Sequence, residues 1–92
     1  MQFLASISLD LTRRPEVERA LPAETARVRE LMQSGQMQAL YIPEGSGAPD
    51  SLWGVFSGDS RQSVERILES LPLHPYMRIE LTQLRSLEPT RT

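Results

Sequence analysis

Hydrophobic and polar residues alternate near both ends of this chain. Apolar residues take every odd position over residues 1–11, and they alternate with polar residues again over residues 77–82. A period of two is typical of a β-strand with one buried face, so the sequence predicts a strand at each place. Residues 37–43 and 52–57 are shorter stretches rich in apolar side chains, and we interpret them as two further strands.

A first helix is predicted between residues 12 and 34. Val17, Leu21, Val28 and Leu31 fall on one stripe of that helix, and the glycine that follows at position 35 suits a left-handed stop. Pro22 interrupts the pattern. It predicts either a kink inside one helix or a short first turn followed by a main helix that begins at the proline.

A second helix is predicted after a capping residue, either Asp59 or Ser60, and it carries one apolar stripe. It ends in the segment LPLHPYMRIEL, residues 71–81. Pro72 and Pro75 stop the helix there because proline lacks an amide donor and disfavours helix in the residue before it. The last strand begins directly afterwards, at Met77.

The predicted order is strand, helix, strand, strand, helix, strand. This order predicts an α+β fold of the ferredoxin-like βαββαβ type, in which two helices cover one face of a four-stranded antiparallel sheet. Several apolar residues fall on the other register of the strands: Leu4, Leu40, Ile42, Trp53 and Val55. An apolar face left open to water is a partner site, so we expect a homodimer, that is, a dimeric α+β barrel. We expect one domain over residues 1–84 and a polar tail over residues 85–92.

Composition narrows the classes of function. All ten basic residues are arginine, so Schiff-base chemistry, which needs a lysine amine, is excluded. The net charge of −2 lacks the basic excess that nucleic-acid binding requires, and no apolar run reaches membrane-spanning length. The absence of cysteine gives no support to an oxidising compartment. We therefore expect a cytoplasmic protein whose partner is a small-molecule substrate, with no nucleic acid and no membrane.

Glu24 is the candidate catalytic residue. Positions 17, 21, 24, 28 and 31 are separated by four, three, four and three residues, so they lie on one side of the predicted helix. Glu24 is the middle position, with two apolar residues on each side of it. A carboxyl group in an apolar setting is harder to ionise, so its pKa rises from about 4.3 toward neutrality and it becomes a useful general base. The alternative is an ion pair with Arg27, three positions further on.

Four further residues are candidates for binding a substrate. Tyr41, Trp53 and Tyr76 combine an apolar ring with a hydrogen-bonding tip, as side chains of small-molecule sites often do. For each of them, a place in the core or in a dimer interface is the alternative. His74 is the fourth candidate, with a packed loop position as its alternative. Because it is the only histidine and there is no cysteine, no metal site is expected.

The residues described so far resemble the muconolactone isomerase family over residues 1–84. The likeness is strongest in LPLHPYMRIEL, which is similar to the L-P-L-x-P-Y-M run that opens the last strand of that family. The resemblance implies a ferredoxin-like α+β barrel, dimers that assemble further into decamers, no cofactor, and a proton shift that moves a double bond in an unsaturated lactone. It also implies a glutamate of the first helix as the base, and Glu24 matches that position by its distance to Gly35.

The chain also departs from the family pattern. The loop after the second strand, EGSGAPDS, is longer and lacks the family's histidine, and Tyr41 stands where tryptophan is common. We predict an isomerase that acts on a small unsaturated lactone or a related enolisable substrate. One alternative is a cyclase or tailoring enzyme for a polyketide-like intermediate. Another is a non-catalytic ligand-binding barrel, whose marks are a filled pocket and a Glu24 that is paired with arginine or exposed.

Overall fold

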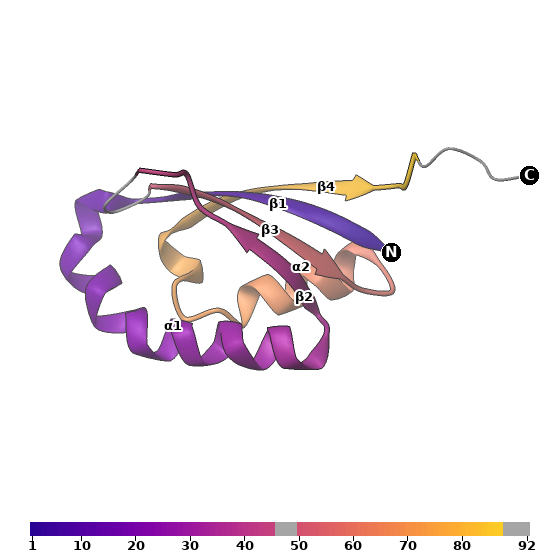
Figure 1. The fold of residues 1–92 in the computed structure, drawn as a ribbon. Coiled ribbons are helices and arrows are strands. Elements are labelled where there is room, and N and C mark those ends of the chain that lie inside the picture. The colour runs from indigo at the N-terminus through magenta and orange to yellow at the C-terminus, as the bar shows by residue number, and fades with distance from the viewer. Residues whose placement is uncertain (46–49, 88–92) are drawn as a thin grey trace, which may run out of the picture.

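The computed structural model describes residues 1–45 and 50–87 (Figure 1). The elements run in the order β1 (Gln2–Leu9), the 3-10 turn η1 (Leu11–Arg13), α1 (Arg14–Ser34), β2 (Met37–Tyr41), β3 (Ser51–Ser57), α2 (Arg61–Glu69), the 3-10 turn η2 (His74–Tyr76) and β4 (Met77–Leu84). This is the predicted βαββαβ order with two added turns. Positions 46–49 of the predicted loop and 88–92 of the predicted tail lie outside the described residues.

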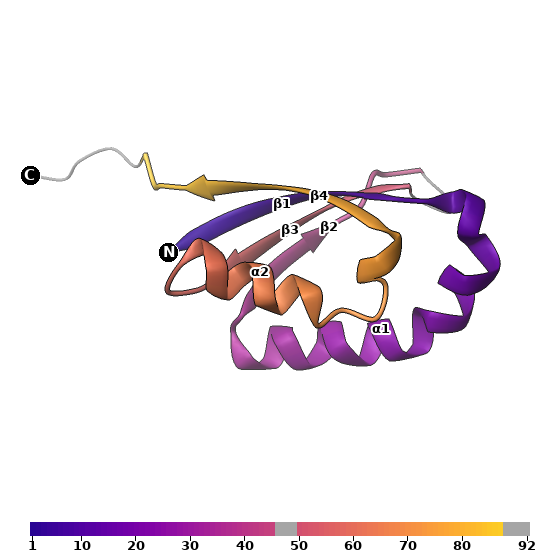
Figure 2. The ribbon, with the colours of Figure 1, turned by 180° about the vertical axis from the view of Figure 1, so that it is seen from behind.

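The strands of the described part form one antiparallel sheet in the order β2-β3-β1-β4. The first strand therefore lies inside the sheet, between β3 and β4. Figures 1 and 2 show α1 and α2 on the same face of this sheet, while the other face carries no helix. The predicted α+β, ferredoxin-like fold is confirmed.

The core lies between the sheet and the two helices. Phe3, Ala5 and Ile7 of β1 are buried on the helix-covered face, as the alternation of the first strand predicts. They pack with Leu31 of α1 and Val64 of α2 in one hydrophobic cluster. Burial of alternate strand residues against amphipathic helices is therefore what holds the layers together.

The first helix is continuous and bent. Pro22 lies inside α1 rather than at its start, and Figures 1 and 2 show the helix changing direction along its length. A proline inside a helix has no amide to donate, and its ring crowds the preceding turn. Of the two predicted alternatives the kink is therefore right. The helix ends at Gly35, whose φ of 82° is the predicted left-handed stop.

The second helix begins at one of its two predicted caps. The Ser60 side chain accepts a hydrogen bond from the Ser63 amide, and the Ser63 side chain accepts one from the Ser60 amide. The cap is thus Ser60 and not Asp59. After α2 the chain passes through Pro72 and the η2 turn and enters β4 at Met77, as predicted. Within residues 1–45 and 50–87, no helix has the length and apolar character needed to cross a membrane.

One predicted face assignment is wrong. Leu40 pairs opposite Gly54 of β3 and lies on the helix-covered face, because a register shift between Met37 and Ala39 reverses the alternation of β2. Ile42 follows the end of β2 and is exposed. The remaining residues assigned to the uncovered face do lie there: Leu4, Trp53 and Val55.

Candidate functional site

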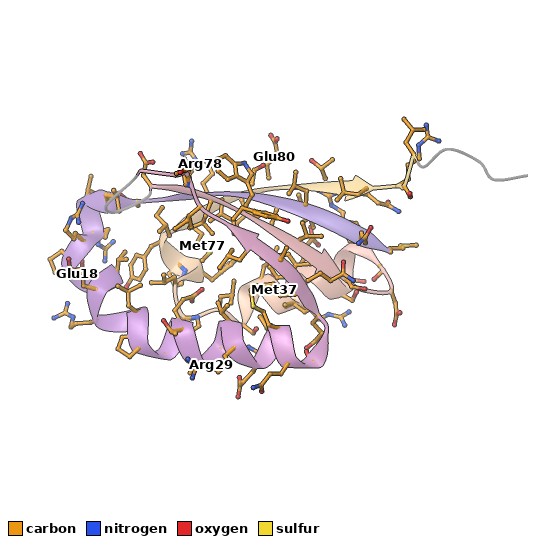
Figure 3. All side chains as sticks on the ribbon, viewed as in Figure 1. Glu18, Arg29, Met37, Met77, Arg78 and Glu80 are labelled. Carbon is orange, nitrogen blue, oxygen red and sulfur yellow. The ribbon has the colours of Figure 1, made fainter. Side chains whose placement is uncertain are left out.

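A cavity of about 470 Å³ lies between α1 and the helix-covered face of the sheet. The strands β1, β2 and β3 line it with Ile7, Leu9, Met37, Leu40, Leu52 and Phe56. The first helix adds Val17, Leu21 and Val28, and the segment after α2 adds Leu71 and Leu73. Figure 3 shows Met37 and Met77, two of the lining residues, between the sheet and α1. A largely apolar cleft of this size is typical of a small-molecule site.

Glu24 is buried in the wall of this cavity. Its surface is 9% exposed. Among the residues that the structure describes, no other charged residue is buried. Val17, one of its neighbours on the stripe, is 6% exposed, and Leu31 is fully buried. The spacing of the first helix thus placed this carboxyl group correctly, among apolar side chains and against the sheet.

The carboxyl group of Glu24 is held by a backbone donor from a distant segment. The amide of Leu73 donates a hydrogen bond of 2.9 Å to Oε1 of Glu24. Leu73 belongs to the short connection between α2 and η2, which the flanking prolines keep out of helix. The helix stop in LPLHPYMRIEL therefore has a second effect, because it frees an amide that orients the acid.

Burial raises the pKa of Glu24 above its ordinary value of 4.5, because the ionised form loses its hydration in the apolar wall. The hydrogen bond from Leu73 acts in the opposite direction and lowers the pKa, but it is the smaller of the two effects. A carboxyl group with a raised pKa holds and releases protons closer to neutral pH, which suits a general acid–base.

The ion pair between Glu24 and Arg27 is not formed. The Arg27 guanidinium lies 3.3 Å from Oε1 of Glu30, and it donates hydrogen bonds of 3.1 and 2.9 Å to the hydroxyl of Ser70. The alternative reading of Glu24 as half of that surface pair is therefore wrong. Arg27 instead ties α1 to the end of α2, close to the segment that presents the Leu73 amide.

The second carboxyl oxygen of Glu24, Oε2, accepts no hydrogen bond from the described residues. The bond from Leu73 goes to Oε1. Since no fully buried side-chain oxygen among these residues lacks a partner, Oε2 keeps some accessible surface, and Glu24 is one of the residues that line the cavity. One oxygen is thus fixed by the backbone, and the other is available for a ligand.

Among the residues that the structure describes, three polar ones line the cavity besides Glu24. Arg14, Glu18 and Thr25 are exposed residues of α1 and mark its open side. Figure 3 shows Glu18 on the first part of that helix. Sequence reasoning missed Glu18 and Thr25, although both follow the helical spacing of the stripe that contains Glu24.

Tyr41 and Trp53 lie on the uncovered face of the sheet, away from the cavity. They are paired opposite each other on β2 and β3, and they are 59% and 37% exposed. Their neighbours in the sheet, Phe56 and Leu40, belong to the opposite register and line the cavity. Strand alternation therefore separates these two aromatic residues from Glu24 within one chain.

His74 and Tyr76 also lie outside the cavity of Glu24. Both are half-buried residues of η2. His74 lines a shallow recess beside α2, together with Arg61 and Glu65. Tyr76 lines another recess, and the guanidinium carbon of Arg13 lies 5.4 Å from the centre of its ring. A single chain thus does not bring the four aromatic and histidine candidates together with the glutamate.

Two solved structures are similar to this chain in fold. The crystal structure of muconolactone isomerase aligns with 100% of this chain and 97% of that chain, at 22% identity and a TM-score of 0.77. The 5-chloro-2-hydroxyhydroquinone dehydrochlorinase of Burkholderia phenoliruptrix AC1100, in complex with 2,5-dihydroxybenzoquinone, aligns with 92% of this chain and 94% of that chain, at 14% identity and a TM-score of 0.65. A search of curated proteins finds no match.

The sequence itself identifies the family. The family model for muconolactone delta-isomerase matches residues 1–88, a range that includes Glu24, the segment that supplies the Leu73 amide, and every strand of the sheet. The match agrees with the resemblance carried by LPLHPYMRIEL and with the fold. This chain belongs to the muconolactone delta-isomerase family.

Proposed function

We propose that this protein is a cytoplasmic, cofactor-free isomerase that moves a double bond by proton transfer, with Glu24 as its acid–base residue. The observation that carries the proposal is the buried carboxyl group of Glu24, which lies in the wall of an apolar cavity and is held at Oε1 by a backbone amide. Membership of the muconolactone delta-isomerase family supports the reaction class.

The reaction begins when the ionised Glu24 takes a proton from a carbon atom that is conjugated, through a double bond, with a carbonyl group. The electron pair of the broken C–H bond enters the conjugated system, and the negative charge reaches the carbonyl oxygen, giving a dienolate. Glu24 then returns the proton to the other end of the dienolate. The double bond has moved, the carboxylate is restored, and neither an oxidant nor a reductant is consumed.

The Leu73 amide has a defined part in this cycle. Its hydrogen bond to Oε1 leaves Oε2 as the oxygen that gains and loses the proton in the proposed cycle, and it gives the carboxyl group one orientation. A fixed orientation reduces the entropy lost when the reacting atoms meet. The raised pKa adds to this because a base closer to neutral pH takes a proton from carbon more readily.

The test is the turnover of Glu24→Gln with muconolactone as the first substrate. Glutamine keeps the acceptor for the Leu73 amide but cannot take a proton, so turnover should fall by roughly a hundredfold or more while the fold is retained. Glu30→Gln is the matched control, because Glu30 is an exposed carboxylate of the same helix outside the cavity lining. Unchanged turnover in Glu24→Gln rules out the proposed role.

A cyclase acting on a polyketide-like intermediate is the second candidate. The observation that favours it is the apolar lining of the cavity, which suits an intermediate with a large hydrocarbon surface. The same carboxyl group would then remove the proton that starts ring closure. A muconolactone turnover rate equal to that in buffer, together with Glu24-dependent consumption of a polyketide-like substrate, would favour this candidate over the isomerase.

The marks of a non-catalytic barrel are not met in the described residues. The cavity is open, Glu24 forms its hydrogen bond with a backbone amide, and the arginine three positions on has other partners. These observations support an enzyme over a ligand-binding module that has lost its chemistry.

The proposal includes a homodimer formed through the uncovered sheet face. Tyr41 and Trp53 are exposed there, on the same face as Val55 of β3 and Leu4 of β1. Apolar surface of this kind favours burial against a second copy. Light scattering coupled to gel filtration tests it. Trp53→Glu should shift the mass toward the monomer, whereas Arg29→Glu, on the outward side of α1 (Figure 3), should leave the dimer intact. A monomeric unmodified chain contradicts it.

A further inference from the structure

The orientation of Glu24 depends on a segment that is distant in the chain. Its Oε1 accepts the hydrogen bond from the amide of Leu73, and no other donor to this carboxyl group occurs among the described residues. Figures 1 and 2 show the connection after α2, which carries Leu73, beside α1. Whatever fixes this connection against α1 therefore also fixes the acid.

One side chain of α1 binds the end of α2 directly. The Arg27 guanidinium donates two hydrogen bonds to the Ser70 hydroxyl, 3.1 Å from Nε and 2.9 Å from Nη2. The Ser70 hydroxyl donates in turn to the carbonyl of Ile67, at 2.6 Å. A hydrogen bond from a charged donor is stronger than one between neutral groups. Because Arg27 lies three positions after Glu24, the part of α1 that carries the acid is also the part bound to α2.

The third donor of Arg27 adds little to this link. Nη1 lies 3.3 Å from Oε1 of Glu30, whose side chain is 66% exposed. An exposed ion pair on one helix contributes little to stability, and it joins α1 only to itself. The link between the two helices at this point thus rests on the Ser70 hydroxyl, and we call it the Arg27–Ser70 contact.

The chain between Ser70 and Leu73 has little slack. The amide of His74 donates to the carbonyl of Leu71 at 2.9 Å, which closes a turn around this segment. Leu71 and Leu73 are each 3% exposed, so their burial holds the segment against the core. Hydrophobic burial is not directional, however, and does not aim an amide. The directed hydrogen bonds of the Arg27–Ser70 contact, three residues before Leu73, supply that constraint.

We propose that Arg27 and Ser70 are positioning residues, which hold the Leu73 amide against Oε1 of Glu24 and so keep the acid in the orientation that proton transfer needs. Neither residue lines the cavity, so both act through the Leu73 amide and not on the substrate. The effect on turnover rests on the proposed function, because Glu24 has to be the acid–base residue. The effect on the titration of Glu24 does not.

Ser70→Ala is the first test, because it removes the acceptor and keeps the charge of Arg27. The hydrogen bond from Leu73 lowers the pKa of Glu24 against the effect of burial, so a weakened bond lets the pKa rise. The carbon-13 NMR titration midpoint of the Glu24 carboxyl group should therefore move upward, with circular dichroism as the check that the variant folds. An unmoved midpoint overturns the proposal.

Ser34→Ala is the matched control. Ser34 ends α1, and its hydroxyl donates to a carbonyl of its own helix, that of Leu31, at 3.0 Å, but it makes no hydrogen bond with Arg27. Its midpoint should equal that of the unmodified protein. Both serine variants keep Arg14 and Glu18, the other charged residues of the cavity lining, to which the described strands and the segment after α2 add none. Equal shifts in the two variants overturn the proposal.

Arg27→Met breaks the same contact from the other side. It should raise the midpoint of Glu24 for two reasons, the lost contact and the lost positive charge. The same change made in a Ser70→Ala background measures the charge effect alone, because the contact is already absent there. The rise in that background should be the smaller one, since two changes in one contact are not additive. Equal rises in the two backgrounds would show that charge alone is the cause, and they would overturn the proposal.

Turnover of muconolactone should follow the position of the carboxyl group. In Ser70→Ala, kcat should fall by roughly threefold to tenfold while KM changes by less than about twofold, because the cavity lining is unaltered and only the aim of the acid is loosened. The acid limb of the pH profile of kcat/KM should move to higher pH with the titration midpoint, since the ionised acid starts the reaction. A purely structural role would leave that limb in place. A raised midpoint with unchanged kcat overturns the proposal.

The positioning role and the acid–base role fail separately. If Glu24→Gln loses the turnover of muconolactone while Ser70→Ala leaves both the midpoint and the turnover unchanged, the acid–base role stands and the positioning role is wrong. If Ser70→Ala raises the midpoint while Glu24→Gln turns over muconolactone as the unmodified protein does, the Arg27–Ser70 contact still holds the carboxyl group and the acid–base role is wrong.

Discussion

The two faces of the sheet are built from the same strands, yet they differ in chemistry. On the covered face, Phe3 and Phe56 are fully buried and a cavity opens beside one buried acid. On the uncovered face, Tyr41 and Trp53 are exposed, and Figure 3 shows Arg78 and Glu80 on that side. The comparison shows that, within one chain, the aromatic residues with polar tips lie away from the cavity, whereas the buried acid lies in its wall.

The largest expected contrast is in stability. Phe56→Ala on the covered face should lower the free energy of unfolding by about 3–5 kcal/mol, because it removes a fully buried ring and leaves a cavity in the core. Trp53→Ala, three residues away on the other face, should cost far less in the dissociated chain. Urea unfolding of both variants at low protein concentration measures the difference. Equal losses would contradict the assignment of the two faces.

A smaller loss of stability is expected from a substitution at Gly54, where the covered face is tightly packed. A β-carbon added at Gly54 would lie 2.7 Å from Cε1 of Phe56, which is closer than real side chains approach. Gly54→Ala should therefore destabilise the fold by about 1–3 kcal/mol through overpacking. The cost should shrink in a Phe56→Leu background, because the smaller side chain makes room. An undiminished cost in the double variant would show that the close approach is not its cause.

The smallest expected effect is a pH dependence of stability with opposite signs at two acids. The folded chain holds the proton of Glu24 at pH values where the unfolded chain has lost it, because burial raises the pKa above 4.5. Stability should therefore fall as the pH rises from about 4.5 through that raised value, and Glu24→Gln should remove this slope.

Asp10 provides the contrasting case. Its hydrogen bonds from the Thr12 hydroxyl and amide lower its pKa below 3.8. The stability that it contributes is present above pH 3.8 and is lost as the pH falls through the lowered value, so Asp10→Asn should affect only the acid end. Denaturant unfolding at a series of pH values measures both slopes. A Glu24→Gln variant with the slope of the unmodified protein would contradict the raised pKa.

The sequence predicts most of the fold because the patterns of apolar residues that mark strands and helices involve residues close together in the chain. The alternation of the end strands, the stripe of α1 and the stop at Gly35 each depend on a few neighbouring residues, and each is found in the structure. Glu24 was placed by the same kind of evidence, since helical spacing alone puts it among apolar side chains.

The details that escaped prediction depend on distant or irregular contacts. The amide that donates a hydrogen bond to Glu24 belongs to Leu73, 49 positions away, and no pattern of neighbouring residues predicts this contact. A register shift in β2 turns Leu40 toward the helices, and a period of two cannot foresee it. Alternation assigned Leu40 to the same face as Trp53, whereas the shift brings Tyr41 opposite Trp53 instead.

The central claim is that apolar burial raises the pKa of the Glu24 carboxyl group above its ordinary value of 4.5, so that the folded chain holds this proton at a higher pH than an exposed glutamate does. The most direct measurement is the carbon-13 chemical shift of its side-chain carboxyl group, followed by NMR against pH in the full-length protein, with Glu24→Gln used to assign the signal. We predict a titration midpoint clearly above 4.5. A midpoint at or below 4.5 would show a carboxyl group that water or a cation stabilises, and it would contradict the account.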